Sequence, residues 1–189
     1  TVLDAGGSGW TLEYARAIND HGWIIGAGRT ATGVQSFLYN TLHGIQGLPI
    51  GATAINDEGE VAGSEGQHAF RWDNVNGTHD LGDLPGGDDV SWAAAINDAG
   101  QVVGAGTTTA GQRAFLWDSM NGMRDLNTLL DGSGDGWTLT EACAVNDQGW
   151  IGGVGVNPDG VAHAFLLVPE PASLLLMAVG LVGLVRRRR

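Results

Sequence analysis

The 189-residue chain contains no lysine, and all nine of its basic side chains are arginines. Four of these arginines stand together at one end of the sequence: Arg186, Arg187, Arg188 and Arg189. Residues 1–168 therefore hold five basic and twenty acidic side chains, a net charge of −15. A body with this charge repels the phosphates of DNA and RNA. The shortage of positive charge argues against a nucleic-acid partner, and we interpret the acidic residues as a solvated surface.

Cysteine is also nearly absent. Cys143 is the single cysteine, which excludes an internal disulfide and a cysteine-based metal cluster. It lies in "EACAVND", a run of small residues typical of a strand. Because an unpaired cysteine behaves as a small hydrophobic residue, we predict that Cys143 is buried and inert.

The signatures of common enzymes are missing as well. The chain has no Gly-x-Ser-x-Gly elbow and no dinucleotide-binding fingerprint, and its five histidines are dispersed. We therefore predict a protein that is not an enzyme. The alternative is a carbohydrate-active or other hydrolytic enzyme, because a fold does not by itself decide function.

What the chain does contain is an internal repeat. A motif of the form Ala-x-Ala-(Ile/Val)-Asn-Asp-x-Gly occurs four times, with its asparagine at Asn19, Asn56, Asn97 and Asn146. Each copy is followed by a short aromatic motif: "SFLY" from Ser36, "AFRW" from Ala69, "AFLW" from Ala114 and "AFL" from Ala164. A third motif, "THDLGDL" from Thr78 and "MRDLNTL" from Met123, closes the unit. Self-similarity at about forty residues predicts a repeat architecture.

The physical chemistry of each motif indicates β-structure. Asn-Asp-x-Gly between two apolar runs favours a type I turn followed by a left-handed glycine, which makes a tight hairpin with a bulge. The aromatic motif is rich in β-formers, and "MRDLNTL" alternates polar and apolar residues. Residues 1–168 are therefore predicted to be an all-β domain of four-stranded units.

Four-stranded units of this length are typical of β-propellers. The fourth unit lacks its last strand, and the opening segment "TVLDAGGSGW" is similar to "NTLLDGSGDGW", the end of the third unit. Pairing of the two ends would close a propeller-like ring and remove exposed sheet edges. The alternative is that residue 1 is an arbitrary cut in a longer array.

The pattern of Ala-Ile-Asn-Asp, Ala-Phe-Leu-Trp and Asp-Leu-Gly motifs resembles the HAF-repeat family of extracellular bacterial proteins. The histidine of the family name is present as His68 and His163 but absent from the other two copies. The resemblance implies an extracellular β-repeat protein and no established catalytic chemistry.

Residues 169–189 have a different composition. Pro169, Glu170 and Pro171 precede fourteen apolar or small residues, 172–185, and the arginine cluster 186–189 follows. As a helix, 172–185 would extend about 21 Å, which is short for a bilayer but sufficient for transient insertion. The arginines would remain on the cytoplasmic side, leaving the β-domain outside. We predict a short C-terminal transmembrane helix, either temporary or retained as a permanent anchor.

The segment "VPEPASLLLMAVGLVGLVRRRR" from Val168 closely resembles the PEP-CTERM sorting domain. That resemblance implies a Gram-negative bacterium that makes exopolysaccharide, export across the inner membrane, and processing by an exosortase, a membrane-embedded transpeptidase-like enzyme. Pro169, Glu170 and Pro171 would be its recognition motif. The protein would then be sorted to the cell surface or the exopolysaccharide matrix.

Two further features remain open. Asp131, Ser133 and Asp135 in "DGSGDG" have the spacing of a calcium loop, which makes bound Ca²⁺, and with it a calcium-dependent adhesion module, a weak alternative to a polar loop. Five of the seven tryptophans recur at equivalent repeat positions, which favours packing between units: Trp72 and Trp117 in the aromatic motif, and Trp10, Trp92 and Trp137 before the first strand. Exposed tryptophans could instead stack on the sugar rings of exopolysaccharide.

Overall fold

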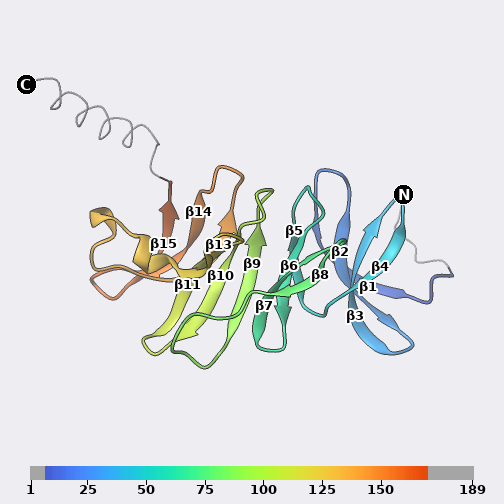
Figure 1. Cartoon of the computed structure of the whole chain (residues 1–189), viewed down its shortest axis with the longest axis horizontal. Helices are drawn as coiled ribbons and strands as arrows, with labels where there is room; N and C mark the ends of the chain where they lie inside the picture. The colour runs from blue at the N-terminus through green and yellow to red at the C-terminus, as the bar shows by residue number, and fades with distance from the viewer. Residues whose placement is uncertain (1–6, 170–189) are drawn as a thin grey trace, which may run out of the picture.

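The computed structural model describes residues 7–169, which form four antiparallel sheets that follow one another along the chain (Figure 1). Sheet 1 consists of β1 (Thr11–Ile18), β2 (Ile24–Thr30), β3 (Gly33–Asn40) and β4 (Gly44–Leu48). Sheet 2 consists of β5 (Ala52–Ile55), β6 (Val61–Glu65), β7 (His68–Asp73) and β8 (Gly77–Asp80). Sheet 3 consists of β9 (Ser91–Ile96), β10 (Val102–Thr108), β11 (Gly111–Asp118) and β12 (Gly122–Asp125), and sheet 4 of β13 (Thr138–Val145), β14 (Ile151–Val156) and β15 (Ala162–Leu167).

Each sheet is one repeat unit, so the prediction of an all-β repeat domain is confirmed. Sheet 4 has three strands within residues 7–169, as its shortened repeat predicts. Two single-turn 3₁₀ helices, η1 (Leu126–Leu129) and η2 (Gly132–Gly134), connect sheets 3 and 4.

The turn between the first two strands has the predicted form in every sheet. In sheet 1, the Gly22 amide donates to the Asn19 carbonyl at 3.0 Å, and the Asn19 amide donates to the Trp23 carbonyl at 3.1 Å. Gly22 has φ of 74°, and the equivalent Gly59, Gly100 and Gly149 have φ of 80°, 71° and 76°. A side chain is strained in this left-handed conformation, which explains the repeated glycine.

A second glycine is required by a β-bulge. In sheet 3, Ala93 and Ala95 pair with the adjacent residues Gly104 and Val103, so Ala94 is the extra residue of β9. The bulge brings the Trp92 carbonyl over Gly104, where a Cβ atom would lie 1.9 Å from the oxygen. Equivalent glycines would place a Cβ atom 2.1 to 2.4 Å from a backbone oxygen in the other sheets: Gly26, Gly63 and Gly153. Close approach of two backbones therefore fixes this position.

Neighbouring sheets are joined at these turns by a repeated set of hydrogen bonds, the turn ladder. The asparagine side chain of each turn donates to the asparagine carbonyl of the next turn: Asn19 to Asn56 at 2.9 Å, Asn56 to Asn97 at 2.9 Å, and Asn97 to Asn146 at 2.8 Å. The aspartate amide donates to the next aspartate carboxylate: Asp20 to Asp57 at 2.8 Å, Asp57 to Asp98 at 2.8 Å, and Asp98 to Asp147 at 2.9 Å. Because the buried Asn56 and Asn97 find their partners in the neighbouring turns, the spacing of the sheets is fixed at their turns.

The hydrophobic core lies in three layers, each between two neighbouring sheets. Ile25 and Leu38 of sheet 1 pack with Val61, Phe70 and Trp72 of sheet 2. The other layers join sheets 2 and 3 and sheets 3 and 4 in the same manner.

The tryptophans follow the predicted packing in part. The prediction that they pack between units is confirmed for the buried Trp72 and Trp117. Trp150 in sheet 4, which is not one of these recurring positions, is 41% exposed.

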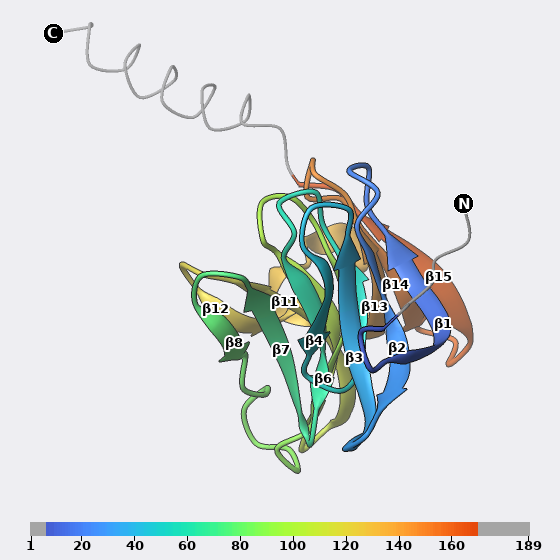
Figure 2. The ribbon, with the colours of Figure 1, turned by 90° about the vertical axis from the view of Figure 1, so that its right-hand side faces the viewer.

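The prediction of a closed, propeller-like ring is not borne out. Sheets 1 and 4 lie at opposite ends of a row (Figure 1), and the view along the row shows the sheets overlapping one behind another (Figure 2). The opening segment, expected to complete sheet 4, runs beside sheet 1 over its described part, where the Trp10 ring lies 6.2 Å from Phe37. Each core layer and each ladder step joins units that are adjacent in sequence. These contacts can all form without contact between the first and last units.

The predicted transmembrane helix, 172–185, lies outside the described residues. Within residues 7–169 no helix has the length and apolar character needed to cross a membrane.

Candidate functional site: a groove between the first two sheets

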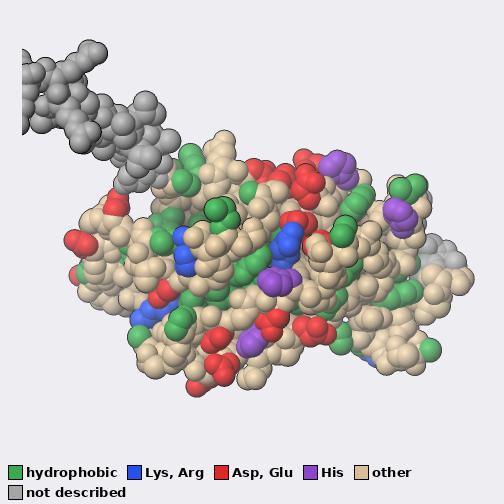
Figure 3. Space-filling view, viewed as in Figure 1, with side chains coloured by type: hydrophobic (Ala, Val, Ile, Leu, Met, Phe, Trp, Pro, Cys, Tyr) green, Lys and Arg blue, Asp and Glu red, His purple; other side chains and the backbone are tan. Residues whose placement is uncertain are grey.

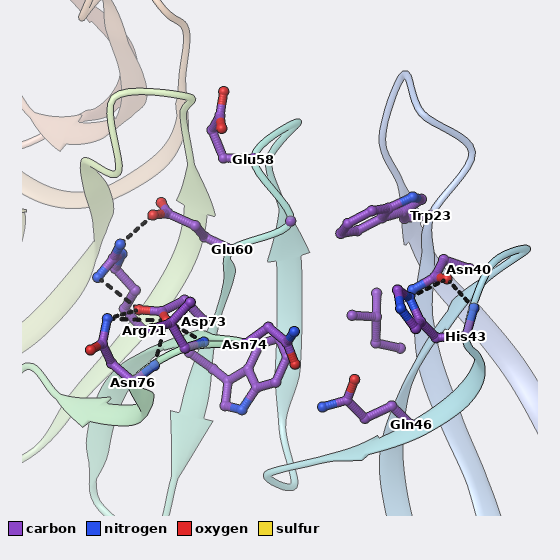
Figure 4. Close-up of a pocket in the computed structure, with 14 residues that line it drawn as sticks. Trp23, Asn40, His43, Gln46, Glu58, Glu60, Arg71, Asp73, Asn74 and Asn76 are labelled. Carbon is purple, nitrogen blue, oxygen red and sulfur yellow. Dashed lines mark hydrogen bonds and ion pairs between the residues drawn. The ribbon is translucent and has the colours of Figure 1, made fainter.

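A groove of about 610 Å³ opens between sheets 1 and 2 (Figure 4). Sheet 1 contributes Trp23, Asn40, His43 and Gln46, and sheet 2 contributes Glu58, Glu60, Arg71, Trp72, Asp73, Asn74 and Asn76. Its wall therefore combines two indole rings with amides, an imidazole and one ion-pair network.

Trp23 is held at the upper end of the groove by its turn. The Trp23 amide donates to the Asn19 side-chain oxygen at 2.8 Å, which fixes the start of β2. Its ring lies over Gly59 of the next turn, where a Cβ atom would be 2.2 Å from the indole. The left-handed glycine of sheet 2 thus provides the space that Trp23 occupies, and the ring remains half-exposed above the groove.

The amide wall is preorganised. Asn40 is only 5% exposed, and its side-chain oxygen accepts from the Leu42 amide at 3.1 Å and the His43 amide at 2.7 Å. These bonds hold the turn that carries His43 on the sheet 1 side of the groove, below Trp23 (Figure 4).

Gln46 of β4 lines the groove on the side of sheet 1. Between sheets 2 and 3 its position is taken by His79, whose ring lies 5.6 Å from Trp117 and fills the equivalent space. A pocket of about 510 Å³ also lies between sheets 3 and 4, but it is lined mainly by leucine and isoleucine, whereas the groove between sheets 1 and 2 combines two indole rings with polar side chains.

Two carboxylates of the sheet 2 wall, Glu60 and Asp73, are paired with one arginine. Glu60 accepts from Arg71 in an ion pair, and Asp73 lies 3.7 Å from the same guanidinium. Hydrogen bonds from the backbone and side chain of Asn76 lower the pKa of Asp73 below its ordinary value. Asp73 is therefore held ionised, which suits an ion-pair network and not a general acid.

The residues singled out for calcium are arranged as a local turn. The Asp131 carboxylate accepts from the Ser133 amide at 2.9 Å and from the Ser133 hydroxyl at 2.5 Å, and these bonds lower the pKa of Asp131. Asp135 ends the same 3₁₀ turn. Over residues 7–169, no three His, Cys, Asp or Glu side chains are grouped as metal ligands.

The prediction that Cys143 is buried is wrong, because its side chain is exposed. Cys143 is the extra residue of the bulge in β13, and it lies on the face of sheet 4 that no described sheet covers. Partial desolvation, together with the nearby Glu141 charge, raises the pKa of the thiol. Cys143 is thus an accessible thiol that is predominantly protonated at neutral pH.

Sequence reasoning missed the groove because no single motif encodes it. The available signal was the residue that follows each turn glycine, which is Trp23 in sheet 1 but Glu60 and Gln101 in sheets 2 and 3. An aromatic at this position, together with Gln46 where the next unit has His79, distinguishes the lining of the first interface.

The charged side chains around the groove are scattered and do not form one patch. Acidic atoms are distributed over several parts of the face in Figure 3, with the few arginines between them. Such a surface offers no continuous anion-binding patch.

Comparison with known proteins identifies one region. Residues 167–189 match the PEP-CTERM protein-sorting motif, which confirms the sequence-based interpretation of the tail. No curated protein and no solved structure matches the chain. PEP-CTERM motifs are recognised by exosortase, so the chain carries a signal for export and for surface or extracellular localisation.

The match contains every residue that the sequence assigns to sorting and to membrane orientation: Pro169, Glu170, Pro171, Arg186, Arg187, Arg188 and Arg189. Pro169 is the last residue that the structure describes. The others, including Arg187 and Arg188 within the arginine cluster, lie outside the described residues. Their individual roles therefore stay predictions, and the family match supports the segment as a whole.

Proposed function

We propose that this chain is a non-enzymatic exported repeat protein of the HAF type that an exosortase processes and delivers to the cell surface or exopolysaccharide matrix of a Gram-negative bacterium. The PEP-CTERM motif at residues 167–189 carries the proposal. The β-domain supports the repeat part of the proposal, since four sheets follow one another and are joined by three core layers.

The tail acts as a sorting signal that holds the protein in the membrane temporarily. The apolar residues 172–185 enter the inner membrane, and the arginines 186–189 hold the end of the chain in the cytoplasm. The recognition motif 169–171 then stands at the outer surface, directly after β15 (Ala162–Leu167). Cleavage near this motif releases the folded β-domain from the membrane.

The groove between sheets 1 and 2 is where the domain contacts polysaccharide. A half-exposed indole, Trp23, offers a flat apolar surface for a sugar ring, and Gln46 and Asn74 offer amide donors and acceptors for hydroxyl groups. Because the domain is strongly acidic, the polysaccharide it accepts is neutral.

Sorting is tested by expressing the full chain in an exosortase-bearing host and determining the C-terminal residue by mass spectrometry. We expect the extracellular protein to end near residues 169–171. The double variant Pro169→Ala/Pro171→Ala should retain the arginine cluster 186–189 and remain in the membrane fraction. Pro158→Ala, a proline change in a turn of sheet 4, is the control and should be processed normally. Recovery of the intact chain from the cytosol would refute the proposal.

Binding in the groove is tested separately, by titrating the protein with the neutral fraction of the host exopolysaccharide and following tryptophan fluorescence. Trp23→Ala should abolish the spectral shift, whereas Trp150→Ala, which removes an exposed indole from sheet 4, should preserve it. An unchanged shift in Trp23→Ala would exclude the groove while leaving the sorting proposal intact.

A further inference from the structure

Neighbouring sheets are joined at their turns by three contacts that recur at each of the three interfaces. Two are the asparagine and aspartate bonds of the turn ladder. The third places the residue after one turn over the glycine of the next. A Cβ atom on that glycine would lie 2.2 Å from Trp23 at Gly59, 3.1 Å from Glu60 at Gly100 and 3.7 Å from Gln101 at Gly149. One geometry therefore repeats along the row.

At the two ends of the row, the groups that would form this contact have no partner among the described residues. In sheet 4, the Asn146 side-chain nitrogen and the Asp147 amide have no hydrogen-bond partner among the described residues. In sheet 1, the Asp20 carboxylate likewise accepts no hydrogen bond from the described part of the chain, and open space lies above Gly22. Sheet 4 thus presents the donors and sheet 1 the acceptors of one further ladder step.

The apolar faces of the end sheets are matched in the same way. Leu166 of sheet 4 is 61% exposed, while its equivalents Leu38 and Leu116 are buried against the following sheet. Ile18 of sheet 1 is 65% exposed, while its equivalents Ile55 and Ile96 pack against the preceding sheet. Each end therefore exposes the side chains that the internal interfaces bury.

We propose that sheet 4 of one copy of this chain binds sheet 1 of a second copy, head to tail, and continues the row. Asn146 and Asp147 then donate to the Asn19 carbonyl and the Asp20 carboxylate of the second copy. Trp150 lies over the second copy's Gly22, as Trp23 lies over Gly59. The occupant is a second copy because its first turn has the backbone and the Asn-Asp-x-Gly sequence that each internal ladder step recognises.

The association is heterologous, since two different faces meet, and it therefore produces rings or filaments and not a symmetric dimer. It also leaves the groove between sheets 1 and 2 accessible. The inference does not depend on the proposed function.

Association is tested by sedimentation velocity on the full chain in mild detergent, which shields the apolar residues 172–185. We expect species larger than a dimer to grow with protein concentration. Trp150→Ala should weaken association about 30-fold, as removal of a central aromatic does in other interfaces. Asp20→Ala should weaken it as well. The matched controls, Leu42→Ala and Asp159→Ala, change exposed residues outside the contact and should have no effect.

Cysteine cross-linking tests the register. Thr53, at the position of Cys143, donates from its hydroxyl to the Ala93 carbonyl at 3.0 Å, and Ala93 is at the position of Ala15. Under oxidation, Ala15→Cys should therefore form disulfide-linked chains between its new thiol and Cys143 of the next copy. The parent chain, with Cys143 alone, should remain uncross-linked.

Three outcomes would overturn the inference. The first is a single species with the mass of one chain up to about 1 mM, where even weak specific contacts are populated. The second is cross-linking through two Cys143 thiols, which would indicate a symmetric dimer. The third is association that Trp150→Ala and Asp20→Ala leave unchanged, which would assign it to the tail.

Discussion

At the scale of single residues, the pair His68–Asp80 provides a titratable contact within sheet 2. The histidine Nδ1 lies 3.0 Å from an Asp80 carboxylate oxygen. This hydrogen bond raises the pKa of His68 above 6.5 and lowers the pKa of Asp80 below 3.8. The stabilisation from His68 is complete below 6.5 and is lost as the pH rises through its folded pKa. The contribution from Asp80 is present above 3.8 and is lost as the pH falls through its folded pKa.

We therefore predict that Asp80→Asn, which retains an oxygen for the Gly82 amide, lowers the pKa of His68 toward 6.5. The free-energy difference from the parent should be largest at mildly acidic pH and should shrink above the folded pKa of His68. NMR titration of the imidazole and urea unfolding at several pH values measure both effects. A His68 pKa that does not respond to Asp80→Asn would contradict the assignment.

At Gly104, sheet 3 has no space for a side chain. A methyl group at this position would lie 1.9 Å from the Trp92 carbonyl oxygen, and no side-chain rotation can relieve a backbone contact. We predict that Gly104→Ala destabilises the domain by about 3 kcal/mol, the upper end of the range for overpacked sites. Gly132→Ala is the matched control, because nothing lies within 4 Å of the added atom. Equal unfolding free energies for the two variants would show that the bulge can move.

At the scale of elements, the turn ladder determines how one sheet is placed on the next. Asn97 is 3% exposed and makes hydrogen bonds in two directions. Its side-chain oxygen accepts from the Gln101 amide at 2.9 Å, and its nitrogen donates to the Asn146 carbonyl at 2.8 Å. One side chain thus closes its own turn and joins sheet 3 to sheet 4.

We predict that Asn97→Ala costs about 2 kcal/mol of unfolding free energy, because it leaves buried backbone groups without partners. Asn97→Asp keeps the acceptor for Gln101 but replaces the donor to Asn146, so it separates the two roles. We expect it to be destabilising as well, with a comparable loss. Asn121→Ala, in an exposed turn where the amide bonds only Asp118, should change little. Full stability of Asn97→Asp would show that the bond between sheets contributes nothing.

The sequence predicts much at this scale, since turn chemistry is local. Asn-Asp-x-Gly specifies the hairpin, and period-two patterns specify the strands, so the four units are evident without coordinates. The stacking of the sheets is harder to predict from the sequence. The ladder joins asparagines that are 37 to 49 residues apart, and nothing in the sequence indicates that they pair. The prediction for Cys143 is wrong because a composition of small residues does not show that the face beyond them is uncovered. The groove is not predictable for a related reason, as its two walls belong to different units.

At the scale of the whole molecule, the relation between the first and last units is the property that sequence reasoning could not determine. Similar unit sequences fit a closed ring and an open row equally well, because each unit recognises only its neighbours. The difference lies in the rotation between adjacent sheets, which is set by many small contacts in the three core layers. The structure shows a row (Figure 1). The exposed side chains of its two end sheets include Ile18 and Leu166.

The imbalance of charge is also a property of the whole chain. Residues 1–168 have a net charge of −15, and their self-repulsion opposes the compact state. We predict that NaCl raises the melting temperature, with most of the gain by about 0.15 M, where the screening length is about 8 Å.

The same measurement decides between general screening and a bound cation. CaCl₂ and MgCl₂ at matched concentration should raise the melting temperature equally if divalent ions only screen the surface, and addition of EDTA without added salt should leave it unchanged. An additional stabilisation by Ca²⁺ alone that disappears in Asp131→Asn would assign a calcium site to the Asp131–Asp135 loop. Because Asp131 already bonds Ser133 within its own turn, we expect no such difference, and the acidic surface then acts only through its total charge.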